Sequence, residues 1–175
     1  MLSKLSEDIK TALTDTIGST ADVLSAVETN TKKVLVGAAA NASDVVSGSV
    51  AAVVSVGNSV TEGSAKVVET TIESVSAAGG DAAAAAHDAA VGSIKGAADV
   101  GGDLGSVAVA AVTGSMTAAG KISGDTTALV TKATVGVIRA ADEIGSEAGS
   151  VVRKALLSSA ALPRQVIEAA LTGKA

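Results

Sequence analysis

The side chains that most often perform catalysis are scarce in this chain of 175 residues. It has no cysteine, no aromatic residue and one histidine, His87. A histidine that activates a nucleophile needs a hydroxyl or thiol within reach, and no nucleophile-elbow motif marks one here, although Asp88 directly follows His87. We interpret His87 as a histidine on the surface of a helix, with a pH-sensing role as the alternative.

Two other patterns look like sites but lack essential parts. The glycines of 101–106 are not followed by the Lys-Ser/Thr pair of a phosphate loop, and no buried strand precedes them. The carboxylates of Asp142 and Glu143 are adjacent, so they point apart on a helix, and the acidic residues are too dispersed for a metal site. The sequence therefore predicts no enzymatic activity, no cofactor, no metal and no small-molecule substrate.

The overall composition excludes further classes. A net charge of −5 and a pI near 4.8 argue against a nucleic-acid partner. A hydrophobic fraction of 47% and a mean hydropathy of +0.48 argue against disorder, and with it against a protectant that folds only on drying. The uncharged stretches 45–61 and 104–120 are shorter than the ~20 apolar residues that a membrane span needs. A membrane-spanning helix is therefore only a minor alternative for them.

Aliphatic residues recur at a spacing of 22 positions, as in the series Val50, Ile72, Ile94, Met116 and Ile138. Twenty-two is twice eleven, and eleven residues complete three helical turns, so each stripe stays on one side of a helix. Charges form i,i+4 ladders on the opposite side. We therefore predict an all-α protein of long amphipathic helices with a 22-residue repeat, folded back as antiparallel hairpins or a bundle.

The repeat defines two groups of candidate functional residues. The first would contact an apolar surface or partner: Val50, Val53, Val56, Ile72, Val75, Ile94, Val100, Val107, Met116, Ile122, Leu129, Ile138, Ile144 and Val151. The second would allow close helix packing or turns: Gly79, Gly80, Gly101, Gly102, Gly124 and Gly145.

The glycine pairs admit two interpretations. A glycine followed by aspartate is typical of a helix end and the cap of the next helix, which gives helices of about 20 residues joined by turns. Alternatively the helices continue, and the glycines are points of curvature. The ladder Lys95, Asp99 and Asp103 crosses one pair without losing its phase, which locally favours the continuous helix. The four-residue spacings of Gly92 and Gly96, of Gly101 and Gly105, and of Gly145 and Gly149 would also permit close approach of a neighbouring helix.

Three regions follow from these patterns. Residues 1–33 are predicted to form a charged amphipathic N-terminal helix, 34–162 the helical repeat array, and 163–175 a short tail after Pro163. We recognise no signal peptide, so we expect a cytoplasmic protein that is peripheral on a membrane or granule.

The 11/22-residue amphipathic pattern of about 48–156 resembles that of apolipoproteins, synucleins, perilipin-type droplet coats and group-3 late-embryogenesis proteins. The segment 61–68, Thr-Glu-Gly-Ser-Ala-Lys-Val-Val, looks similar to a synuclein repeat, and small Ala-rich granule coats of the phasin type are also similar. These resemblances imply coating of an apolar body. One difference is that proline separates the repeats of apolipoproteins, whereas glycine separates the repeats of this chain.

Two functions are consistent with these observations. The first is a structural protein that coats an apolar surface (lipid, membrane or granule) and self-associates side by side, so that its partners are the surface and copies of itself. The alternative is a self-assembling helical filament, tube or bundle without lipid.

Overall fold

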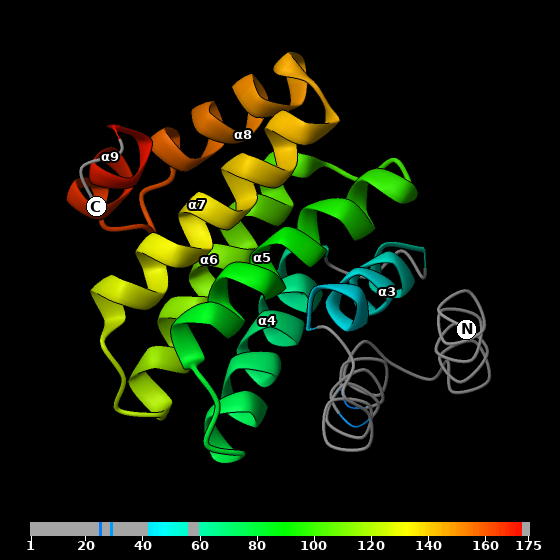
Figure 1. Cartoon of the computed structure of the whole chain (residues 1–175). Helices are drawn as coiled ribbons and strands as arrows, with labels where there is room; N and C mark the ends of the chain where they lie inside the picture. Colours follow the sequence, from blue (N-terminus) through cyan, green and yellow to red (C-terminus); the bar gives the residue numbers. More distant parts are fainter. Residues whose placement is uncertain (1–24, 26–28, 30–41, 56–59, 173–175) are drawn as a thin grey trace.

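A computed structural model describes residues 25, 29, 42–55 and 60–172, and within these ranges it contains helices and turns but no β-strand. The predicted all-α class is therefore confirmed for this part of the chain. The helices are α3 (Ala42–Ser55), α4 (Val60–Ala77), α5 (Ala82–Asp99), α6 (Leu104–Lys121), α7 (Thr126–Ile144), α8 (Ser146–Ser158) and α9 (Arg164–Thr172). Figure 1 shows them packed together, from α3 at one end to α8 and α9 at the other.

Three helices begin at aspartates that are 22 residues apart in sequence. Asp81 precedes α5, Asp103 precedes α6 and Asp125 precedes α7, each with an extended backbone. Their carboxylates accept hydrogen bonds from backbone N–H groups of the first turn, for example from Ala83 at 2.8 Å and from Gly105 at 2.9 Å. Each carboxylate thus satisfies donors that a helix start leaves unpaired, which fixes where the helix begins.

The preceding helices end in a matching turn. Gly79, Gly101 and Ser123, again 22 residues apart, have positive φ angles of 78°, 69° and 53°. The next residue donates its N–H back into the helix, from Gly80 to the Val75 carbonyl at 2.9 Å and from Gly102 to the Ala97 carbonyl at 2.7 Å. This is a Schellman ending, which explains glycine at two of the three positions.

The continuous-helix interpretation is therefore wrong for the described glycines. Gly79, Gly80, Gly101, Gly102 and Gly124 lie in turns between helices, and Gly145 alone separates α7 from α8. The i,i+4 spacing of the charges could not reveal these turns, because an aspartate that caps the next helix keeps the same spacing after the previous helix has ended. Within the described ranges none of the helices combines the length and hydropathy that a membrane span requires.

The core is built from valine, isoleucine and alanine, with a few leucines. Ile72, Ile94, Leu156 and Ile167 are among the largest fully buried side chains. Ile167 belongs to α9, so the C-terminal segment that the sequence marks as a tail contributes to the core. The predicted helix of residues 1–33 lies almost wholly outside the described residues.

Candidate functional site

The predicted apolar stripe lies mainly on the inner surfaces of the helices. Six of its members are buried: Val50, Val53, Ile72, Ile94, Val107 and Leu129. Five are half-buried, and all but Val100 pack against the core: Val75, Val100, Met116, Ile122 and Ile138. Ile144 and Val151 are 47% and 45% exposed, and Val56 lies outside the described residues. Contact of the stripe with an external apolar surface stays a prediction.

Glycines in the middle of helices allow backbones to touch. Gly92 lies against the carbonyl group of Ser43, Gly114 against that of Ala65, and Gly136 against that of His87. A Cβ atom at any of these glycines would be less than 3.0 Å from the carbonyl oxygen, so no larger residue fits without a backbone shift. Close contacts of this kind bring Cα–H groups to carbonyl oxygens and give dense packing.

The three contacts follow one register. In each, the glycine lies 49 residues after the carbonyl that it meets, and Gly96 meets the carbonyl of Ser47 with the same separation. The close approach that the glycine spacing permits is therefore found at Gly92 and Gly96, but a Cβ atom at Gly101 or Gly145 would meet nothing within 4 Å. Because the contact moves forward along both helices together, α3 and α5 run parallel. Sequence reasoning did not single out Gly114 and Gly136, although they follow Gly92 at the repeat spacing.

Buried hydroxyl groups form another regular series, which the sequence analysis did not single out. Ser49, Thr71, Ser93 and Ser115 are 22 residues apart and buried. Each donates to the carbonyl four residues earlier, at 2.9, 2.8, 2.9 and 3.0 Å. The bond satisfies the hydroxyl within its own helix, so a small polar residue can occupy a tightly packed position without an unpaired group.

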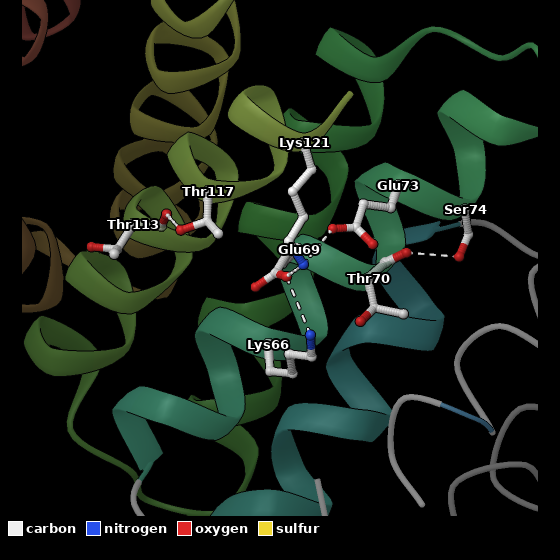
Figure 2. A network of polar contacts seen from close by, with 8 residues as sticks. All are labelled: Lys66, Glu69, Thr70, Glu73, Ser74, Thr113, Thr117 and Lys121. Atoms are coloured by element: carbon white, nitrogen blue, oxygen red, sulfur yellow. Dashed lines mark hydrogen bonds and ion pairs between the residues drawn. The ribbon is translucent and has the colours of Figure 1, made fainter. Parts of the chain in front are cut away.

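A cluster of charges joins α4 to α6 (Figure 2). The carboxylate of Glu69, which is only 8% exposed, accepts hydrogen bonds from Lys121 and, at 3.2 Å, from Lys66. Lys121 also lies 3.0 Å from Oε1 of Glu73. Lys121 and Asp125 have the i,i+4 spacing of the charge ladders, but Asp125 caps α7 and Lys121 reaches across to α4.

The cluster changes the acidity of its members. Burial by itself would raise the pKa of Glu69, but the hydrogen bonds from Lys121 and Lys66 outweigh it and leave the pKa below its ordinary value. The hydrogen bonds that Lys121 donates to Glu69 and Glu73 raise the pKa of the lysine. Glu69 and Lys121 are therefore both charged near neutral pH, and the cluster acts as a charge clamp between α4 and α6.

Other ion pairs lie on the outer surface, where they connect neighbouring helices or turns of one helix. Arg153 of α8 makes a bidentate contact with Asp142 of α7, at 2.7 and 2.6 Å. The hydrogen bond from Arg153 lowers the pKa of Asp142. Lys95 of α5 lies 3.8 Å from Glu143 of α7, and Arg139 lies 3.3 Å from Glu143 at the i,i+4 spacing within α7. Such exposed pairs contribute little individually, because water and salt screen them.

The residues that were considered for catalysis or phosphate binding lie within helices or at helix ends. His87 is half-buried on α5, and its Nδ1 lies 3.1 Å from the carboxylate of Asp88. Gly101 and Gly102 belong to a helix ending, and Asp103 is a cap. Among the described residues, no group of three or more histidine or acidic side chains could hold a metal ion.

The exposed apolar side chains gather on two helices. Val135 and Ile144 of α7, and Val151 and Leu157 of α8, are the large apolar residues exposed in the described ranges. A groove of about 430 Å³ between α7 and α9 is lined by Val135, Ile138 and Ala170, with charged residues at its edge. A second groove, of about 530 Å³, lies where Ile144 and Val151 meet Leu104 of α6.

Comparison with known proteins gives no relationship on which to base a function. No family model, no curated protein and no solved structure matches the chain. The candidate functional features are therefore the stacked helix faces themselves and the exposed surface of α7 and α8.

Proposed function

We propose that this protein is a non-enzymatic structural protein whose amphipathic helices associate with one another and need no lipid for their assembly. In this proposal each 22-residue unit is one helix, the chain reverses direction at each glycine turn, and helices two units apart stack in parallel. The observation that carries the proposal is the set of glycine-to-carbonyl contacts, each spanning 49 residues.

The register of these contacts gives the geometry of the proposed stack. Two repeat units comprise 44 residues, so a separation of 49 residues shifts each parallel helix by five residues against the one below it. At a rise of 1.5 Å per residue, the shift is about 7.5 Å. At this register the stacked helices can slide little along one another, because any residue larger than glycine would clash with the carbonyl that it faces.

The burial of the aliphatic stripe supports an assembly of protein alone. Val50, Ile72 and Ile94 are fully buried against other helices of the same chain, so they are not offered to a lipid in this conformation. Burial of apolar area contributes roughly 25 cal/mol per Å². A single helix whose stripe is valine and alanine would gain less from a lipid surface than one carrying leucine and phenylalanine.

A second candidate function is the coating of an apolar surface. The exposure of Ile144, Val151 and Leu157 favours it, since these side chains are available without any rearrangement. Full coating would require the helices to separate at their glycine turns and rotate the buried stripe outward. The charge clamp between α4 and α6 and the close glycine contacts oppose that opening.

Flotation with phospholipid vesicles, combined with circular dichroism, separates the two functions. We expect the purified full chain to be strongly helical in lipid-free buffer, to unfold cooperatively, and to remain at the bottom of the gradient. Flotation accompanied by a rise in helicity would overturn the proposal in favour of the coat. Negative-stain microscopy of the lipid-free protein then shows the form of the assembly.

A further inference from the structure

The outward faces of α7 and α8 carry one repeat position that is buried or half-buried on the earlier helices. Residues 22 apart occupy this position on successive helices: Ser47, Glu69, Val91, Thr113, Val135 and Leu157. The carbonyl of Ser47 lies under Gly96, Glu69 is clamped by Lys121, and Val91 packs against the core. On α7 and α8 the same position holds Val135 and Leu157, which are 37% and 40% exposed.

The helix that follows covers this face only in part. α9 has nine residues, half the length of α5 or α6, and its Ala170 forms one side of the groove beside Val135 and Ile138. Arrays of stacked repeats ordinarily end in a unit with a polar outer face. Here α7 and α8 present valine and leucine instead, so this face is suited to a further contact.

We propose that this end face, formed around Val135 and Leu157, binds the same face of a second copy of this chain and so makes a tail-to-tail dimer. The inference rests on the proposed function, because it extends the internal stacking contact beyond the chain. At this repeat position α3 and α4 each contact another helix of the same chain, through Ser47 and Glu69, and the end face continues that series.

The charges around the groove fit a second copy better than a lipid surface. Arg139, Asp142 and Glu143 line it, so both signs of charge occur there, and each of these residues is also in an ion pair within the chain. A mixed edge can complement itself across a two-fold axis, where the same patch is used by both partners. An anionic membrane would be attracted by a basic edge, and this one is not basic.

Light scattering during size-exclusion chromatography tests the dimer with the full chain. We expect a mass twice the 16.6 kDa of one chain at micromolar concentration. Val135→Asp and Leu157→Asp would each bury an unpaired charge in the interface and raise the dissociation constant by more than about tenfold. Val151→Asp is the matched control, since Val151 is 45% exposed but lies in the other groove, and it should leave the mass unchanged.

Cysteine crosslinking tests the tail-to-tail arrangement, because the natural chain contains no cysteine. Under mild oxidation Val135→Cys should form a disulfide-linked dimer, whereas Val151→Cys should remain monomeric. A helical, lipid-free protein that stays at 16.6 kDa, or whose mass responds equally to the control variant, would overturn the dimer and leave the proposed function standing. A protein that is helical only with vesicles would instead remove the proposed function itself.

Discussion

Replacing Gly114 by alanine should destabilise the protein, although alanine is the better helix former. Within a helix, glycine to alanine normally stabilises by about 1 kcal/mol. At Gly114 the new methyl carbon would overlap the carbonyl oxygen of Ala65 and lie 3.0 Å from its carbonyl carbon and 3.1 Å from its Cα. Backbone atoms cannot rotate away, so we expect an overpacking cost of about 3 kcal/mol and a net loss of about 2 kcal/mol.

Gly120→Ala on the same helix provides the matched control. Gly120 is exposed, and a Cβ atom there meets nothing within 4 Å, so the substitution should stabilise by about 1 kcal/mol. Urea unfolding followed by far-ultraviolet circular dichroism measures both variants, since the chain has no aromatic residue to report by fluorescence. If Gly114→Ala is as stable as Gly120→Ala, the backbone contact between α4 and α6 is refuted.

Three further substitutions test other parts of the structure by the same unfolding measurement. Because the pKa of Glu69 is lowered in the folded state, its ionisation stabilises the protein above the unfolded value near 4.5, and this contribution is lost as the pH falls through the lower folded pKa. Glu69→Gln should therefore lower the free energy of unfolding at neutral pH and make it depend less on pH in the acid range. If Glu147→Gln, at an exposed site, lowers it equally, the charge clamp is contradicted. Ser123→Gly should stabilise by about 1 kcal/mol, since a side chain at φ 53° is strained, and a loss of stability would argue against the turn. Ile94→Ala should cost about 2–5 kcal/mol, and Ile144→Ala, at a site 47% exposed, less than about 1 kcal/mol; similar costs would exclude the buried stripe.

The helical class and part of the core were predictable from the sequence, because the spacing of Val50, Ile72 and Ile94 places them on one side of a helix whatever the tertiary structure. The many buried alanines of the core were not singled out. The turns at the glycine pairs were predictable only as one of two interpretations, the other being a continuous helix that curves there. Asp103 continues the charge ladder of the helix before it while capping the helix after it, so local phase and chain reversal are compatible.

The contacts between helices required the structure. The repeat places Gly92, Gly114 and Gly136 in one column, but the shift of five residues between stacked helices depends on turn geometry that spacing alone does not give. The clamp between Glu69 and Lys121 joins residues 52 positions apart, and neither belongs to the aliphatic pattern. Ile144 and Val151 are exposed, whereas the other described members of the predicted stripe are buried or half-buried, and a periodic pattern cannot indicate this difference.

Hydrogen exchange of the lipid-free protein, read by mass spectrometry, tests most directly whether the helices are held by contacts with one another. The central claim predicts that amides of α4 to α7 are strongly protected and exchange only on cooperative opening, with the slowest exchange around Ile94 and the glycine contacts. Rapid exchange throughout these helices, with protection gained only when vesicles are added, would contradict it.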